Sequence, residues 1–464
     1  MGYVSAAGAL LLAGYLALFF AAWGWLANRT MASASWTKKS LGSRQIASSA
    51  SRPPRNDMLL ILPAAWVVLE YLRSVLLTGF GWNPLAHTQW KWPEVIQLAE
   101  LTGAWGISFL VVLVNVALFQ FLRRDVSARS RRWAAFAGLT LLGLTAGYGW
   151  LRLPGVGSYP SGTFRVCLVQ GNIPQTHKWD EAFREEIWQR YERLTQEAAR
   201  ANPQVLVWPE TAAPNFLEEP DVRGRLERVA RSAAAALLAG VPTERLSSGL
   251  LYNSAVLLDG GSRQVDRYDK LHLVPFGEYV PLKLLFGWLE NVVPIGDFSP
   301  GERFTVFQLP PPAARGAWEV SRFSVLICFE DLFPGLARTF VREGARWLVV
   351  ITNDGWFGRS AASLQHLQAS VLRAVENRVW VARAANTGWT GFVDPAGRRR
   401  SAEPVSGLRP AIPRFEPGVA AEDLPSYTVT DESLSLYTRW GDWFPALCGL
   451  LAVGLSFLPS KRKL

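Results

Sequence analysis

Long apolar segments constrain the fold of this chain more than any other feature of its sequence. Four of them lie near the N-terminal end, at residues 3–27, 58–78, 96–122 and 133–151, and a fifth covers residues 442–459. Each reaches or approaches the roughly 20 residues that an α-helix needs to cross a bilayer. The sequence therefore predicts a bundle of membrane helices joined to a polar part that lies between the fourth and the fifth segment.

The composition agrees with a membrane part joined to a water-soluble part. Apolar residues make up 49% of the chain, and the 21 Trp residues are typical of proteins that keep amphipathic rings at lipid–water boundaries. The net charge of +10 comes from basic residues beside the apolar segments, which favours membrane orientation over nucleic-acid binding. The three Cys form no Cys-x-x-Cys pair and only four His occur, so we expect neither a zinc site nor a disulfide framework.

Charges in the loops predict which way the helices run. Loop 28–57 carries six Lys or Arg residues, loop 123–132 carries five Arg, and the chain ends in "KRKL", whereas loop 79–95 has only Lys91, offset by Glu94. Because Lys and Arg mark the cytoplasmic side, the basic loops and the tail should lie inside and the large polar part outside. The same assignment places residue 1 outside, and an odd number of missing upstream spans would restore a cytoplasmic start. The first segment lacks the basic region of a signal peptide, so we interpret it as a membrane helix.

The polar part shows a different pattern, in which short β-branched runs alternate with amphipathic stretches. We therefore divide the chain into membrane helices (1–151), a soluble domain (152–440) and a C-terminal helix with a basic tail (441–464). The predicted strands cover residues 164–172, 203–211, 253–259, 323–331, 347–354 and 379–386. The predicted helices cover the stretch "DEAFREEIWQRYERLTQEAARA" and residues 221–239 and 361–376, while 309–317 and 398–425 are expected to be turns or loops. This alternation predicts an α/β layered domain.

Polar side chains stand where several predicted strands end. Glu210 ends "VLVWPE", Cys328 ends "FSVLIC", Asn353 and Asp354 end "LVVITND", and Asn386 ends "VARAAN". Because ligands of open α/β sheets bind at the carboxyl ends of the strands, these positions predict one shared site.

A cysteine becomes a nucleophile only as a thiolate, which a nearby base or cation must favour. No His lies beside Cys328 in the sequence, although His272 and His366 remain alternatives for a Cys–His pair. The other arrangement is a carboxylate base with an ammonium group, for which Lys270 in "YDKLHLVPFGEYVP" is the natural candidate. The carboxylate would take the thiol proton, and the ammonium with backbone N–H groups would stabilise a tetrahedral oxyanion. Taken alone, a Cys at a strand end is more often structural.

The motifs carry more weight together. "VQGNIPQTHKWDE", "WPET", "DKLHLVPFGEYVP", "ICFEDLF", "NDGWFG" and "RAANTG" occur in this order, on an α/β pattern, between membrane helices. This combination resembles the carbon–nitrogen hydrolase (nitrilase) superfamily and, within it, the apolipoprotein N-acyltransferases of bacterial envelopes. The resemblance covers essentially the whole chain. It implies a membrane α-helical bundle plus an α/β domain, a nitrilase-like four-layer αββα sandwich. The family usually has more helices before this domain.

The resemblance also implies roles for individual residues. Matching motifs make Glu210 the general base, Lys270 the oxyanion stabiliser and Cys328 the nucleophile of a Glu–Lys–Cys triad.

Five further residues follow from the same motifs. Glu278 is expected to pair with the triad lysine, and Glu330 to support the nucleophile, unless both form structural salt bridges. Trp179 is expected near the lipid entrance, or as an interfacial anchor. Asn353 and Asn386 are expected to order loops rather than to catalyse.

The implied reaction transfers a fatty acyl chain from a membrane phospholipid, with phosphatidylethanolamine as the expected donor. The chain passes through a cysteine thioester to the N-terminal diacylglyceryl-cysteine of a diacylated apolipoprotein, without metal or diffusible cofactor. The implied location is the bacterial inner membrane, with several spans and the catalytic domain on the periplasmic side. One alternative is a membrane-tethered amidase that uses water as the acceptor. A non-enzymatic scaffold on a decayed hydrolase domain is disfavoured, because all three triad positions are occupied.

Overall fold

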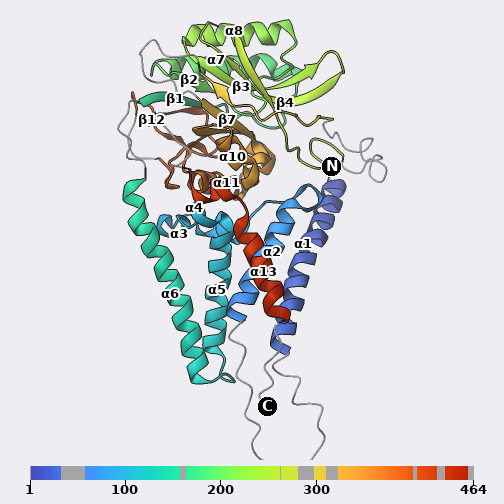
Figure 1. Ribbon diagram of the computed structural model, residues 1–464. Coiled ribbons are helices and arrows are strands. Elements are labelled where there is room, and N and C mark those ends of the chain that lie inside the picture. Colours follow the sequence, from blue (N-terminus) through green and yellow to red (C-terminus); the bar gives the residue numbers. More distant parts are fainter. Residues whose placement is uncertain are drawn as a thin grey trace, which may run out of the picture. The chain divides into compact units, whose positions relative to one another are not determined.

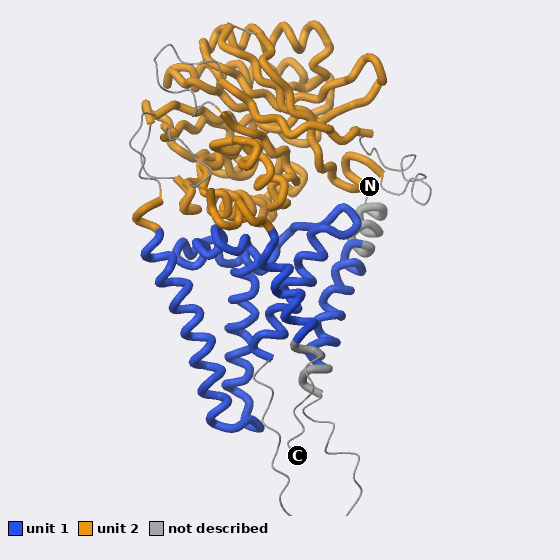
Figure 2. Tube along the Cα trace, viewed as in Figure 1, with its two compact units in different colours: residues 1–152, 442–464 blue, residues 153–441 orange. Residues whose placement is uncertain are grey.

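The computed structural model describes residues 2–32, 58–156, 163–261, 263–280, 297–309, 322–400, 405–425 and 434–457. The chain divides into two compact units, which Figure 2 shows in different colours. One unit holds residues 1–152 together with residues 442–464, and the other holds residues 153–441. The first and last parts of the sequence therefore fold together, although the whole second unit separates them in the chain.

The first unit is helical. Its α-helices are α1 (Gly2–Ala32), α2 (Met58–Val75), α3 (Pro93–Ile96), α4 (Ala99–Thr102), α5 (Ala104–Leu122), α6 (Ala128–Arg152) and α13 (Trp443–Phe457). Within the described residues, three helical stretches are long and apolar enough to cross a membrane, at Met58–Thr78, Ala104–Leu122 and Ala128–Gly155. Shorter apolar helices cover Leu12–Asn28 and Trp443–Gly454.

One predicted apolar segment is not a single helix. The sequence pattern suggests a continuous helix over residues 96–122, but α5 begins only at Ala104. Gly103 precedes it with φ 66°, a left-handed backbone that glycine adopts without steric cost and that ends α4. The residues before this break form the short helices α3 and α4 instead.

The last helix packs into the helical unit. Ala64 and Val67 of α2, Trp105 of α5 and Cys448 of α13 are buried in one cluster. The indole N–H of Trp105 also donates to a carboxylate oxygen of Asp442 at 2.8 Å. Apolar packing and this polar contact together tie the two ends of the sequence.

The second unit contains two six-stranded sheets. The first sheet has the order β12 (Gly418–Pro425), β1 (Thr163–Gln170), β2 (Val205–Val207), β3 (Ala236–Arg245), β4 (Leu250–Leu258) and β5 (Gln264–Asp269). The second has the order β11 (Ala411–Ile412), β10 (Thr390–Val393), β9 (Trp380–Ala385), β8 (Trp347–Thr352), β7 (Arg322–Ile327) and β6 (Phe307–Gln308). Strands β1, β2 and β3 are parallel, as are β7, β8 and β9, while the outer strands pair antiparallel.

The two sheets lie face to face between two layers of helices. Strand β1 contacts β9 and β10, and β4 contacts β7. Figure 1 shows α7 (Arg184–Ala199) and α8 (Pro220–Ala233) over the first sheet, and α10 (Pro334–Arg342) and α11 (Ala362–Asn377) over the second. The predicted four-layer αββα sandwich is confirmed.

Helix α7 shows how the sequence pattern builds a layer. Ile187, Tyr191, Leu194 and Ala198 recur at three- and four-residue steps, and all four are buried against the first sheet. Charged residues occupy the opposite face, so the amphipathic pattern fixes which side of the helix meets the strands.

Two predicted segments are wrong. The predicted helix over 221–239 ends at Ala233, Ala234 takes a left-handed φ of 50°, and residues 236–245 form β3. Its Ala and Leu residues favour helix, but burial between β2 and β4 overrides that weak preference. The predicted loop over 398–425 contains β11 and the whole of β12, which pairs with β1 along its length. Most of the predicted turn at 309–317 lies outside the described residues.

Candidate active site

Cys328 stands at a sharp change of direction in the chain. Strand β7 ends at Ile327, and Cys328 begins the short 3-10 helix η7 (Cys328–Leu332) with φ 53°. A left-handed φ is unusual for a residue with a side chain and persists only where its surroundings hold it. Because β7 lies inside the parallel part of its sheet, the turn places the thiol at the carboxyl edge predicted for the site.

Glu210 follows β2 on the facing sheet, and its side chain is 6% exposed. The backbone around it runs very close to β3. A Cβ added at Gly240 would lie 2.2 Å from the carbonyl oxygen of Pro209 and 2.7 Å from the Cα of Glu210. Only glycine fits at this position of β3. Gly240 therefore lets the backbone of Glu210 lie close against β3, which positions its carboxylate.

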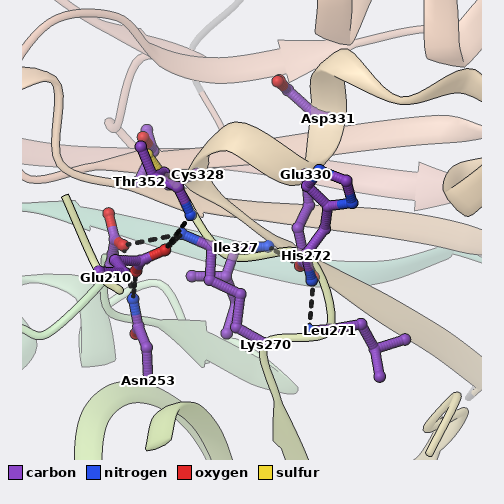
Figure 3. Close-up of polar contacts among 12 residues, drawn as sticks. Glu210, Asn253, Lys270, Leu271, His272, Ile327, Cys328, Glu330, Asp331 and Thr352 are labelled. Carbon is purple, nitrogen blue, oxygen red and sulfur yellow. Dashed lines mark hydrogen bonds and ion pairs between the residues drawn. The ribbon is translucent and has the colours of Figure 1, made fainter. Parts of the chain in front are cut away.

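Lys270 follows β5 and is 1% exposed. Its ammonium nitrogen Nζ lies 2.8 Å from Oε2 and 2.9 Å from Oε1 of Glu278, and 3.9 Å from Oε1 of Glu210. Figure 3 shows Lys270, Glu210 and Cys328 gathered at one place, with strands of both sheets behind them. The structure therefore brings together three groups that are far apart in the sequence.

Asn253 of β4 joins the two carboxylates and was not predicted. Its buried side-chain amide donates from Nδ2 to Oε1 of Glu210 at 2.8 Å and to Oε1 of Glu278 at 2.9 Å. The amide thereby fixes the orientation of both acids around the lysine. The only signal in the sequence is an Asn inside the apolar run "NSAVLLD", where asparagine is depleted because it suits strands poorly.

The charges around Cys328 oppose one another. Burial raises the pKa of the Cys328 thiol, and the charge of Glu210 raises it further, whereas the Lys270 ammonium and a hydrogen bond from Thr352 lower it. The result lies well above the ordinary pKa of a cysteine. Burial alone would lower the pKa of Lys270, but the negative groups around it, Glu278 foremost, raise it, so this lysine stays cationic. The thiol rests protonated beside a carboxylate that can accept its proton.

Lys178 adds a second buried ammonium that was also not predicted. Its Nζ donates to the main-chain oxygen of Glu210 at 2.9 Å. Burial lowers the pKa of Lys178 to about 8, although the negative charges of Glu210 and Cys328 act to raise it. The neighbouring Trp179 is 53% exposed, so the same turn carries one buried cation and one exposed aromatic ring.

Glu330 joins the segment around Lys270 to the end of the strand before Cys328. Its buried Oε1 accepts hydrogen bonds from the Tyr268 hydroxyl at 2.7 Å and from the backbone N–H groups of Leu271 at 2.8 Å and His272 at 3.0 Å. Its Oε2 accepts from the backbone N–H of Ile327 at 2.7 Å. Burial raises the pKa of Glu330 to about 7, although the lysine charge and these hydrogen bonds lower it.

Asn353 and Asn386 hold the segment that leads to the Lys178–Trp179 turn. The amide of Asn386 donates to the carbonyl of Ile173 and to Oδ1 of Asn353, at 2.9 Å each. Asn353 in turn donates to the side-chain oxygen of Gln175 at 2.7 Å. Both amides contact the loop backbone or its side chains.

His272 and His366 were the alternative partners for the thiol, and the two have different contacts. Nε2 of His366 lies 3.2 Å from the carbonyl oxygen of Cys328, so its contact is with the main chain of this residue. The His272 ring packs against Phe333 with their centroids 3.8 Å apart. In the described parts of the chain, no group of three His, Cys, Asp or Glu side chains is arranged to hold a metal ion.

Comparison with known proteins shows which family the chain belongs to. The sequence model of the carbon–nitrogen hydrolase family matches residues 165–418, and that of the apolipoprotein N-acyltransferase N-terminal domain matches residues 1–117. The chain is 41% identical to an apolipoprotein N-acyltransferase of Geobacter metallireducens over 88% of its own length and 75% of that protein. It is 34% identical to one of Methylococcus capsulatus, over 99% of this chain and 82% of that protein.

Among solved structures, an amidase from Nesterenkonia sp. matches with a TM-score of 0.41 and 22% identity, over 58% of this chain and 94% of the amidase. These two sequence relatives match most of this chain, at 41% and 34% identity. The chain therefore belongs to the apolipoprotein N-acyltransferase family of the carbon–nitrogen hydrolases.

Proposed function

We propose that this protein transfers a fatty acyl chain from a membrane phospholipid to the N-terminal diacylglyceryl-cysteine of an apolipoprotein, through a thioester on Cys328. One observation carries the proposal. In a chain of this family, a buried Lys270 ammonium lies between the carboxylates of Glu210 and Glu278, beside a thiol whose pKa burial raises, Glu210 raises further and Lys270 lowers. Phosphatidylethanolamine is the proposed donor.

The first half of the reaction forms the thioester. Glu210 takes the proton of the Cys328 thiol as the sulfur attacks the sn-1 ester carbonyl of the phospholipid. Negative charge develops on the carbonyl oxygen, where the Lys270 ammonium stabilises it together with backbone N–H groups. When the intermediate collapses, the C–O bond of the ester breaks and Glu210 returns the proton to the departing lysophospholipid oxygen.

The second half moves the acyl group to nitrogen. The free α-amino group of the diacylglyceryl-cysteine attacks the thioester carbonyl, and Glu210 accepts a proton from the attacking amine. The C–S bond breaks, the amide is formed, and the sulfur regains its proton from Glu210. A thioester must be kept from water between the two halves, or the enzyme would only hydrolyse lipid.

The location follows from the substrates. The protein is a membrane protein by family and by its apolar helices, and we propose that it spans the bacterial inner membrane several times with the catalytic unit on the periplasmic side. The Lys and Arg residues of loop 123–132 and of the C-terminal tail support a cytoplasmic position for those segments. Both substrates are lipids anchored in a bilayer, so an enzyme held in the same bilayer meets both without extracting either.

The test uses intact mass. Purified protein is incubated with a phospholipid of known sn-1 chain, and its mass should rise by the acyl group less one hydrogen. The Cys328→Ala variant should stay unmodified, while the matched Cys167→Ser variant should be acylated, because Cys167 is buried in β1 away from the proposed triad.

Adding a diacylated lipopeptide separates transferase from hydrolase. If the protein is a transferase, the acyl adduct should disappear from the protein as the lipopeptide gains the mass of the acyl group. Loss of the adduct with release of free fatty acid and an unchanged lipopeptide would favour the water-acceptor alternative. A parent protein that never becomes modified would refute the thioester.

A further inference from the structure

We infer that His366 is a positioning residue for the nucleophile: its Nε2–H holds the main-chain carbonyl of Cys328, and a buried cluster of opposite charges holds His366 in turn. The inference rests on the proposed role of Cys328 as the nucleophile. It assigns a function to a buried charge cluster that the proposed reaction does not itself use.

The hydrogen bond itself fixes where the proton of His366 must be. Nε2 lies 3.2 Å from the carbonyl oxygen of Cys328, and the imidazole of His366 is fully buried on α11. A carbonyl oxygen can only accept a hydrogen bond. Nε2 therefore carries a hydrogen whether the ring is neutral or charged, and the contact does not depend on the charge of the histidine.

Two carboxylates and one guanidinium surround the ring. Oδ1 of Asp354 lies 2.8 Å from Nδ1, and Oδ1 of Asp331 lies 2.9 Å from Nε2. Arg383 reaches Oδ2 of Asp331 at 3.0 Å and Oδ2 of Asp354 at 3.1 Å. All four side chains are fully buried.

The cluster is balanced when His366 is protonated. Burial by itself lowers the pKa of His366, but Asp331 and Asp354 raise it to about 9 against the opposing charge of Arg383. Two cations then face two anions, which is the condition under which buried charges are tolerated. Because every member has charged partners, the imidazole has little freedom to rotate away from the carbonyl.

The same cluster reaches the other end of the cysteine. Oδ1 of Asp354 also accepts a hydrogen bond from the Thr352 hydroxyl at 3.3 Å, and the same hydroxyl lies within hydrogen-bonding reach of the Cys328 sulfur. Figure 3 shows Thr352 beside Cys328. Asp354 therefore connects to the sulfur through Thr352 and to the carbonyl through His366, so one carboxylate organises both ends of the nucleophile.

The carbonyl of Cys328 needs such a partner. Its residue adopts a left-handed φ of 53°, which ends strand geometry and takes the carbonyl out of the β7 ladder. A buried carbonyl without a donor is costly, and the peptide unit between residues 328 and 329 would relax by rotating. The same peptide unit carries the N–H of Phe329, so a donor on its oxygen also polarises that N–H. Loss of the His366 contact should therefore slow the chemistry more than it weakens lipid binding.

Two substitutions of similar size separate the Nε2 side of the ring, which faces Cys328 and Asp331, from the Nδ1 side, which faces Asp354. In His366→Asn, the short amide reaches about as far as Nδ1, so it can keep the contact with Asp354 but not that with Cys328. In His366→Gln, the longer amide reaches about as far as Nε2 and can still donate to the Cys328 carbonyl. Each variant is reacted with phospholipid in a single turnover, and thioester formation on Cys328 is followed by intact mass at several phospholipid concentrations.

We expect the maximal rate of thioester formation to fall by roughly 10- to 100-fold in His366→Asn, the scale of a buried acceptor left without its donor. The phospholipid concentration at half-maximal rate should change by less than about 3-fold, and His366→Gln should recover most of the lost rate. Equal maximal rates in the Asn and Gln variants would overturn the inference, as would a change confined to the half-maximal concentration. A parent protein that forms no thioester would instead refute the proposed function, so the two failures are distinguishable.

Discussion

The hydroxyl of Thr352 contacts the sulfur of Cys328, the proposed nucleophile, and its removal gives a sharp test. Thr352 ends β8 and is fully buried. Its one hydroxyl proton can turn from Asp354 to the sulfur, and a hydrogen bond donated to the sulfur lowers the pKa of the Cys328 thiol, whereas burial and the charge of Glu210 raise it. The change Thr352→Val keeps the shape of the side chain and replaces the hydroxyl by a methyl group. Asp354 loses only a 3.3 Å contact and keeps His366 at 2.8 Å, so the fold should survive.

The magnitude follows from the two protonation states of the sulfur. A hydrogen bond to the thiolate is worth about 1.5–3 kcal/mol, and one to the neutral thiol about 0.5–1.5 kcal/mol. The difference of about 1–2 kcal/mol corresponds to a pKa higher by roughly one unit, and to roughly 5- to 30-fold less thiolate at neutral pH. The more basic sulfur is also a better nucleophile, with a Brønsted slope of about 0.4–0.5, which cancels nearly half of the loss. We therefore expect alkylation of Cys328 in Thr352→Val to be roughly 2- to 6-fold slower than in the parent.

Iodoacetamide alkylation, counted on the Cys328 peptide by mass spectrometry, measures this rate without any lipid. The matched control is Thr352→Ser, which keeps the hydroxyl and should react within about 2-fold of the parent. The buried thiols Cys167 and Cys448 report in the same sample whether the variant has loosened. A Thr352→Val protein that melts like the parent and alkylates as fast, or faster, would show that the hydroxyl does not stabilise the thiolate.

Three further outcomes are expected from other parts of the site. Asn253→Leu removes two hydrogen bonds donated to carboxylates, each worth about 1.5–3 kcal/mol. The rate of thioester formation, measured by intact mass, should therefore fall by at least about 10-fold. An unchanged rate would mean that the amide does not orient the acids. Gly240→Ala places a methyl group 2.2 Å from a backbone oxygen beside Glu210, which should cost about 1–3 kcal/mol and lower the melting temperature, whereas a parent-like melt would contradict the close approach. The folded-state pKa of His366 is raised from 6.5 to about 9, so its stabilisation is fully present below pH 6.5 and is lost as the pH rises through 9. Melting temperatures from pH 6 to 10 should therefore decline more steeply in the parent, by the equivalent of about 3 kcal/mol, than in His366→Gln, and parallel curves would argue against a charged imidazole.

Sequence patterns predicted the helices and strands whose own residues carry a clear periodicity or an apolar run. The apolar face of α7 and the buried runs of β1, β7, β8 and β9 are visible in the sequence because each carries its own periodicity or hydrophobic run. The errors over residues 221–239 and 398–425 have a common cause. Strand β3 is rich in Ala and Leu, which favour helix, and the stretch 398–425 that contains β12 is rich in Pro, Arg and Ser, which favour a loop. Both are strands because of neighbours that are distant in the sequence, such as β1 beside β12.

The residues of the candidate site also fall into two groups, those that the sequence predicted and those that only the structure revealed. Glu210, Lys270 and Cys328 were found because each lies in a motif with a family resemblance, and their assignment to catalysis stays a prediction. Asn253 and Lys178 lie at hydrogen-bonding distance from Glu210, yet only the pairing of β4 with the first sheet and the turn after β1 bring them there. A single polar residue inside an apolar strand belongs to no sequence pattern that identifies its partner. Residues of this kind can be assigned to a site only from the three-dimensional structure.

The charges of the site explain why a lysine is held by two acids rather than one. In the resting state Lys270 lies beside two carboxylates, Glu278 in close contact and Glu210 at 3.9 Å. In the proposed reaction the thiol proton moves to Glu210, so that acid loses its charge and the sulfur gains one, and the sum of charges within the site is unchanged. Glu278 still anchors the ammonium, which therefore stays in place while its more distant partner changes from Glu210 to the sulfur and then to the oxyanion. A site that moves charge without changing its total needs no ion or water to enter, and this suits a reaction in which the thioester must stay dry.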